Sequence, residues 1–219
     1  MKQLGTGLAM YVQDYDETYP NYRFLPLGSH NRGDFEQNSW KSVVFPYIKD
    51  TQTFVCSDNP SHKTASDDPE YKISYAANTA LNPRDYPAHS STPPISRKAK
   101  GSGVFGNELS PGVNATDIVS PAECIAVVEM AHLTQNNFCV DIADDGAPRK
   151  GENGQTVRAY SDALFTGHNG GSNYVFADTH AKWLKPTQTN STANFWYRDG
   201  TKLSFEGNLT IQNAEANKP

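Results

Sequence analysis

One short apolar run constrains the fold of this chain more than any other feature. Residues 123–130 contain five consecutive apolar residues, Cys-Ile-Ala-Val-Val, between two glutamates. A continuous apolar run of this length, rich in β-branched side chains, is typical of a strand that is covered on both faces. We therefore predict that residues 123–130 form a central strand of a sheet.

The polarity of the chain comes from uncharged side chains, and this favours loops and strands over long helices. Of its 219 residues, 37% are hydrophobic and 20% charged, and about 52 are Asn, Ser or Thr. A further 16 are Gly and 14 are Pro, so many turns are expected. The net charge is −5, which argues against nucleic acid as a partner because phosphate binding needs clustered Lys and Arg.

The first residues predict a helix over 2–14. Apolar side chains recur there at steps of three and four residues, which places them on one helix face: Leu4, Leu8, Tyr11 and Tyr15. Residues 1–3 include no Ser, Thr, Asp or Asn that could cap the helix. We expect residues 1–17 to be the remnant of a longer helix; the alternative is an ordinary frayed end.

The other expected elements are short. A second helix is expected over 38–49, with Ser39 as its N-cap and Pro46 bending or ending it. Strands are expected over 53–56, 73–78, 173–178, 181–184 and, as a hairpin around Asp199-Gly200, 194–205. The pattern predicts an α+β fold in one globular domain over 1–212, an N-terminal helix packed on an antiparallel sheet with long loops. Residues 213–219 are expected to be a flexible tail.

His168, Asp178 and His180 are the first candidate site. Two histidines and one aspartate can hold a metal ion if a hairpin brings them together. Their spacing matches no known metal signature, and Asp in a turn commonly accepts hydrogen bonds from nearby backbone amides. A structural role of these three residues in the hairpin is therefore the favoured interpretation.

A cluster of acidic residues predicts a weaker site for calcium. Asp141, Asp144 and Asp145 precede Gly146, and clustered carboxylates near a turn suit this ion. The pattern lacks the order and the closing Glu of an EF-hand loop, so a solvated acidic loop is the favoured alternative.

The three cysteines leave the redox state of the chain open. Cys56, Cys124 and Cys139 contain no CxxC pair, which argues against a zinc knuckle or a thioredoxin-type motif. Cys124 and Cys139 are the nearest pair in sequence and the candidate disulfide. Buried free thiols are the equally weighted alternative.

The sequence gives no sign of an enzyme. It contains no GxSxG, HExxH, Walker or dinucleotide-binding motif. Aromatic side chains in polar segments could instead stack on sugars, although such residues are more often core: Tyr22, Trp183, Trp196 and Tyr197.

Three segments of the chain resemble a known family. They are residues 2–20, residues 40–58 and residues 167–186, and in the last of these His168 is followed by nine residues and then Asp178. Together they resemble bacterial prepilin-type proteins, the pseudopilin-like proteins with a C-terminal motif of His, nine residues and Asp-Gly. Thr179 stands where the motif has Gly, and this puts the turn geometry in question because a β-branched residue tolerates positive φ poorly.

The resemblance implies a type IV pilin-like fold and a structural function. The chain would be a subunit of a filament in a type IV pilus or a type II secretion-like system, held in the cell envelope or outside the cell. Its partners would be further copies of itself through an N-terminal apolar helix, and other pilins or secretion components. No cofactor is expected beyond calcium at residues 141–145. The alternative is an exported module that binds a glycan or another surface partner.

Overall fold

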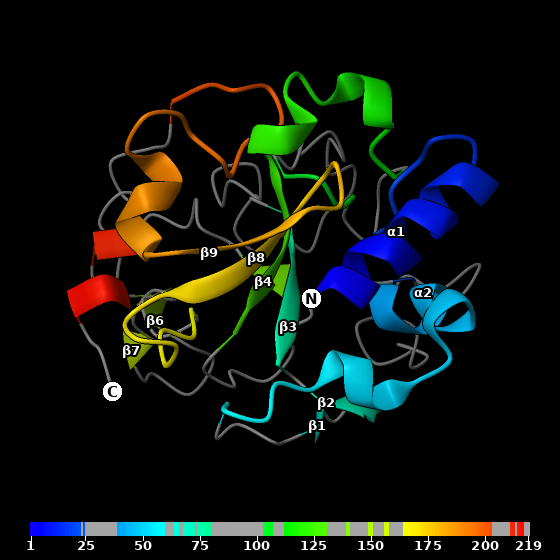
Figure 1. Ribbon diagram of the computed structural model, residues 1–219, viewed down its shortest axis with the longest axis horizontal. Helices are drawn as coiled ribbons and strands as arrows, with labels where there is room; N and C mark the ends of the chain where they lie inside the picture. The colour runs from blue at the N-terminus through cyan, green and yellow to red at the C-terminus, as the bar shows by residue number, and fades with distance from the viewer. Residues whose placement is uncertain are drawn as a thin grey trace.

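The computed structural model combines helices with a sheet that has five strands among the described residues, so the chain has an α+β fold (Figure 1). It describes residues 1–22, 24, 39–59, 64–65, 68–72, 74–79, 103–106, 112–130, 139–140, 149–150, 156–157, 164–202, 211–212 and 214–216. The helices are α1 (Lys2–Asp14) and α2 (Trp40–Ile48). Short 3-10 helices are η1 (Thr51–Phe54), η3 (Ala115–Asp117), η4 (Pro121–Glu123) and η5 (Pro186–Asn190).

The main sheet has the strand order β5-β3-β4-β8-β9. Its strands are β3 (Tyr75–Asn78), β4 (Ile125–Glu129), β5 (Cys139–Val140), β8 (Ser172–Phe176) and β9 (Ala181–Leu184). Four of them form an antiparallel array, and β5 pairs in parallel with β3. Two separate antiparallel pairs consist of β1 (Thr64–Ala65) with β2 (Asp68–Lys72), and of β6 (Arg149–Lys150) with β7 (Thr156–Val157).

Strand β4 lies in the centre of the sheet, as its apolar run predicts. It is hydrogen-bonded to β3 on one side and to β8 on the other, and all five of its residues are buried. Because packed side chains cover both faces of β4, its sequence does not alternate between apolar and polar residues as that of a half-exposed strand does. The predicted hairpin over 173–184 is confirmed as β8 and β9.

Helix α1 packs beside α2 and against the sheet. Its bounds match the prediction, and its buried face contains Leu4, Leu8, Tyr11 and Val12. Tyr15 extends the predicted stripe but is 54% exposed, with its ring stacked on that of Tyr11 at 4.2 Å. Figure 1 shows α1 and α2 side by side next to the sheet, so the two helices form one layer that covers part of it.

Helix α2 begins as its sequence predicts. The Ser39 hydroxyl accepts a hydrogen bond from the Lys41 backbone N–H at 3.2 Å, which satisfies one amide of the first turn. Pro46 lies inside the helix, which ends two residues later at Ile48. Trp40 anchors the helix in the core, where its ring makes edge contacts with Phe54 and Phe105.

Two predicted strands are absent where the structure describes these residues. The strand expected over 53–56 is replaced by η1, because the Asp50 carboxylate accepts from the Gln52 amide and starts a 3-10 turn. No strand occurs over 194–202, where Asp199 accepts from the amide and hydroxyl of Thr201 and forms a local turn instead.

The predicted tail is wrong for residues 214–216. These residues are helical, and Ala214 is only 2% exposed. The Glu215 carboxylate accepts hydrogen bonds from the amide and hydroxyl of Thr187, so this segment is attached to η5. Because the segment is mostly polar, its sequence did not predict that one small apolar side of it is buried.

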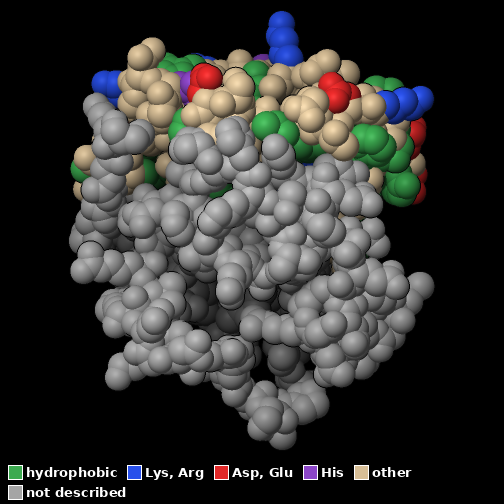
Figure 2. All heavy atoms as spheres, turned by 90° about the horizontal axis from the view of Figure 1, so that it is seen from below, with side chains coloured by type: hydrophobic (Ala, Val, Ile, Leu, Met, Phe, Trp, Pro, Cys, Tyr) green, Lys and Arg blue, Asp and Glu red, His purple; other side chains and the backbone are tan. Residues whose placement is uncertain are grey.

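The described surface is mixed in character. Figure 2 shows one face of the molecule, on which acidic and basic side chains are scattered among hydrophobic and neutral polar ones wherever side chains are coloured. Among the described residues there is no helix with the length and apolar character needed to cross a bilayer.

Candidate functional site: a buried Cys-Glu-His cluster

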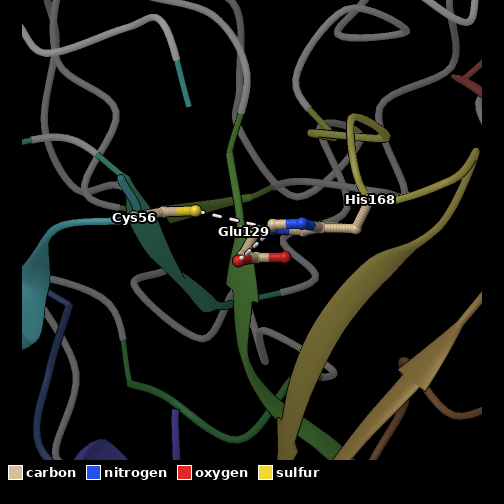
Figure 3. Close-up of side chains that lie close together, drawn as sticks. All are labelled: Cys56, Glu129 and His168. Atoms are coloured by element: carbon tan, nitrogen blue, oxygen red, sulfur yellow. Dashed lines mark hydrogen bonds and ion pairs between the residues drawn. The ribbon is translucent and has the colours of Figure 1, made fainter. Parts of the chain in front are cut away.

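Three chemically reactive side chains converge at one end of the sheet (Figure 3). Cys56 comes from the segment after η1, Glu129 is the last residue of β4, and His168 precedes β8. Because β4 is antiparallel to β3 and β8, its end lies beside the beginnings of both neighbours. The three segments are far apart in sequence, and only the folded sheet brings them together.

The His168 Nε2 atom is the meeting point of the cluster. It lies 3.1 Å from Glu129 Oε1 and 3.5 Å from Cys56 Sγ. One oxygen, one nitrogen and one sulfur atom therefore all lie within 4.8 Å of one another. Cys56 and Glu129 are buried, whereas the His168 side chain is 21% exposed.

The second carboxylate oxygen of Glu129 is held by the start of β8. Oε2 accepts hydrogen bonds from the Asn173 backbone N–H at 2.7 Å and from its side-chain amide at 3.0 Å. The Ser172 hydroxyl lies 3.5 Å from the same oxygen. A carboxylate buried to 1% exposure is stable only with such partners. They fix the orientation in which Oε1 faces His168.

The His168 ring is positioned on its other sides as well. Its Nδ1 atom lies 3.6 Å from Asp58 Oδ2, and its plane meets the Phe165 ring edge-on at 5.1 Å between centroids. The Trp183 indole N–H donates to the His168 carbonyl at 2.8 Å. Together with Asn173, His168 and Trp183 line an open hollow of about 470 Å³, so the ring is at the border between core and solvent.

The environment keeps the protons of Cys56 and of the nearby Tyr75 bound. Burial raises the pKa of the Cys56 thiol, and the negative charge of Glu129 adds to this effect. Burial also raises the pKa of the Tyr75 phenol well above its ordinary value, again with a contribution from Glu129. A protonated thiol is not a nucleophile, so this arrangement does not favour covalent catalysis by Cys56.

The structure separates the predicted metal residues His168, Asp178 and His180. Asp178 and His180 occupy the turn between β8 and β9, whereas His168 lies before the opposite end of β8. Five strand residues at about 3.3 Å each separate the two places, so the three residues cannot share an ion. Asp178 instead accepts from the His180 amide at 3.2 Å and contacts the His180 ring, as in the structural interpretation.

The three carboxylates of the predicted calcium site, Asp141, Asp144 and Asp145, lie outside the described part of the chain.

The candidate disulfide between Cys124 and Cys139 is not formed, because Cys124 is a buried free thiol. Cys139 pairs with Ala77 in β3, and Ala77 pairs with Val127 in β4. Cys139 and Cys124 are therefore separated by two strand spacings of nearly 5 Å each and by three residues along β4. This separation is larger than a disulfide can span.

Two of the four aromatic side chains proposed for sugar stacking belong to the core. Trp196 is fully buried, and its indole N–H donates to Thr189 at 2.8 Å. Tyr22 is 7% exposed. Trp183 is 42% exposed and borders the hollow, which leaves it as the candidate with the most accessible ring.

Sequence reasoning missed Cys56 and Glu129 as site residues. A usable signal was present for Glu129, since a carboxylate at the end of a fully buried strand requires a partner. Cys56 gave no local signal, because its partners are more than 70 positions away along the chain.

Comparisons with known proteins give no match of any kind. No family model, no curated protein and no solved structure is similar to this chain at a significant level.

Proposed function

We propose that this chain is the globular part of a pilin-type subunit, a structural protein of an envelope or extracellular filament. The observation that carries the proposal is contact among the three segments through which the sequence resembles prepilin-type proteins. Cys56 of the middle segment contacts His168 of the C-terminal segment at 3.5 Å. Tyr19 of the N-terminal segment donates from its hydroxyl to the carbonyl of Ala177 at 2.7 Å.

The N-terminal helix also contacts the C-terminal motif directly. Gly5 lies so close to the turn after β8 that a Cβ atom there would be 2.5 Å from the Thr179 carbonyl oxygen. At one end of β8, the turn that contains Thr179 therefore contacts α1. At the other end, His168 belongs to the polar cluster. The three segments that resemble one family thus pack on one another. This supports the proposal that they form a single structural unit, in which the N-terminal helix packs on the sheet.

In this proposal, the exposed outer face of helix α1 contacts another subunit. Lys2, Gln3, Thr6, Met10 and Gln13 are exposed on it, opposite the buried apolar stripe. In a filament, the apolar part of each subunit helix would precede α1 and pack with its counterparts, driven by burial of apolar surface. The described domain would then form the outside of the filament, where a mixed polar surface is suitable.

The native polypeptide in its own cells tests this proposal. We expect its mass and N-terminal sequence to show an apolar segment of about 20 residues ahead of α1, long enough to cross a bilayer. Antibodies against the domain should label envelope or surface filaments, and cells without the gene are the control. A native chain that starts at Met1 and stays in the cytoplasm would contradict the proposal.

Recognition of a glycan is the second candidate function, and one observation favours it. Trp183 borders the open hollow together with Asn169 and Asn173, a combination of an aromatic face and amide groups that suits a sugar. Its indole N–H is already bound to His168, which limits it to stacking. Binding to a glycan array that is lost in Trp183→Ala, but kept in Phe195→Ala, would support this alternative.

A further inference from the structure

We propose that Cys56, Glu129 and His168 form a binding site for a divalent transition-metal ion, with zinc as the best fit. The site would connect the segment after η1, the end of β4 and the beginning of β8. This proposal is independent of the filament function, because it rests only on the polar cluster.

Two of the three donor-atom separations are close to those of a tetrahedral metal site, and the third, between Cys56 Sγ and the Glu129 carboxylate, is within 4.8 Å. With zinc–sulfur bonds of about 2.3 Å and zinc–nitrogen or zinc–oxygen bonds of about 2.0 to 2.1 Å, neighbouring ligand atoms lie roughly 3.3 to 3.6 Å apart. Nε2 of His168 is 3.5 Å from Sγ of Cys56 and 3.1 Å from Oε1 of Glu129. Small side-chain movements would therefore suffice to coordinate an ion.

Without a metal, the cluster can be held by hydrogen bonds from His168 Nε2 and from the Cys56 thiol to the Glu129 carboxylate. A single Nε2–H cannot point at both Glu129 Oε1 and Cys56 Sγ, and an Nε2 without a proton cannot donate to the carboxylate. A metal ion would give a different arrangement, in which it accepts one lone pair from each of the three atoms. The thiol proton is then released to solvent as the ion binds.

The residues around the cluster resemble the outer partners of metal ligands. A carboxylate on the far nitrogen of a coordinating histidine fixes its tautomer, and Asp58 lies 3.6 Å from Nδ1 of His168. The amide groups of Asn173 hold the other oxygen of Glu129, which leaves Oε1 directed toward the site. Both ligating side chains thus have the support that metal centres usually require.

The ligand set selects the class of ion. Thiolate and imidazole suit zinc and related transition metals, whereas calcium and magnesium prefer sites built from oxygen atoms alone. Three protein ligands leave one tetrahedral position, which water occupies in sites with this number of ligands. Of the three ligands, His168 lines the open hollow.

Metal binding by the purified chain tests the proposal. After removal of metal with a chelator, titration with zinc against a chromophoric competitor should show one equivalent bound per chain. Cobalt in place of zinc should give a thiolate-to-metal charge-transfer band. Both signals should be lost in Cys56→Ser, and zinc affinity should fall at least about tenfold in Glu129→Gln and His168→Gln.

Two control variants separate the site from unspecific binding. Cys124→Ser changes a buried cysteine at the opposite end of β4 and should keep the cobalt band. Asp117→Asn removes an exposed carboxylate elsewhere and should bind zinc as the parent does.

Asp58→Asn should weaken zinc binding by roughly 10- to 100-fold, as for other outer partners.

Circular dichroism of each variant before metal addition shows whether it is folded. Less than one equivalent of zinc in the parent protein would overturn the proposal, as would equal affinity in the parent and the three folded ligand variants. In either case the cluster would be a hydrogen-bonded contact between His168 and Glu129 without a metal function.

Discussion

At the scale of single residues, Thr179 has the most unfavourable backbone conformation for its type. Its φ is 77°, in the left-handed region that favours glycine. The Thr179 amide donates to Phe176, and the Phe176 amide donates to the His180 carbonyl. This is a three-residue hairpin loop whose last position has positive φ and normally requires Gly. The structure therefore explains why a Gly would be expected there.

Thr179→Gly should stabilise the protein. Relief of the left-handed conformation contributes about 1 to 2 kcal/mol, and the greater freedom of Gly in the unfolded chain takes back roughly 0.5 to 1 kcal/mol. We expect the free energy of unfolding in urea to rise by up to about 1 kcal/mol. Thr179→Ala is the control and should show no such gain, since it keeps the Cβ atom. Equal effects of both changes would argue against backbone strain.

At the scale of elements, two glycines let α1 approach its neighbours closely: Gly5 faces the turn after β8, and Gly7 faces α2. A Cβ at Gly5 would lie 2.5 Å from the backbone oxygen of Thr179, whereas a Cβ at Gly7 would lie 2.6 Å from a side-chain atom, Cγ1 of Ile48. A backbone atom in a hairpin cannot move aside as a side chain can. The spacing between α1 and the sheet is thus set at Gly5.

Gly5→Ala should destabilise the domain more than Gly7→Ala does. Both changes gain the same helix propensity, about 1 kcal/mol, so the comparison isolates the steric cost. Overpacking against the backbone costs typically 1 to 3 kcal/mol, so after the gain in helix propensity we expect a net loss of up to about 2 kcal/mol for Gly5→Ala. Thermal and urea unfolding would measure it. A Gly7→Ala variant as unstable as Gly5→Ala would show that the contact with Thr179 is not limiting.

The elements that sequence predicted are those with a strong local period or a continuous apolar run. Helix α1 followed from a stripe at steps of three and four, and β4 from its apolar run. The strand expected over 53–56 failed because one Asp50 hydrogen bond outweighed a weak β preference. The Cys56–Glu129–His168 cluster was missed because its geometry depends on strand order, which no local pattern encodes.

At the scale of the whole molecule, the core holds several ionisable groups in neutral form. Burial raises the pKa of the Cys124 thiol to about 12, and it raises the pKa of the Tyr19 and Tyr174 phenols above their ordinary values. Ordinary values near 9 and 10 apply to the unfolded chain. Between these values and about pH 12 the unfolded chain binds fewer protons than the folded one, so stability must fall as pH rises.

The contribution of these groups to the free energy of unfolding should therefore be constant below about pH 8 and decline between about pH 9 and 12. Each fully shifted group can contribute a slope of up to about 1.4 kcal/mol per pH unit. Urea unfolding at a series of pH values measures the decline. Tyr174→Phe should make it shallower, while Tyr15→Phe, at an exposed position, should leave it unchanged. A flat profile to pH 11 would contradict the buried neutral state of these groups.

The pairing of β8 gives the interval between His168 and Asp178 a physical meaning. One end of the strand must present Asn173 to the Glu129 carboxylate, and the other must place the hairpin loop under Gly5. Side chains alternate between the faces of a strand, so loss or gain of one residue in between would exchange buried and outward positions along β8. Nine intervening residues therefore act as a fixed length, in which a substitution keeps the pairing of β8 and an insertion or deletion does not.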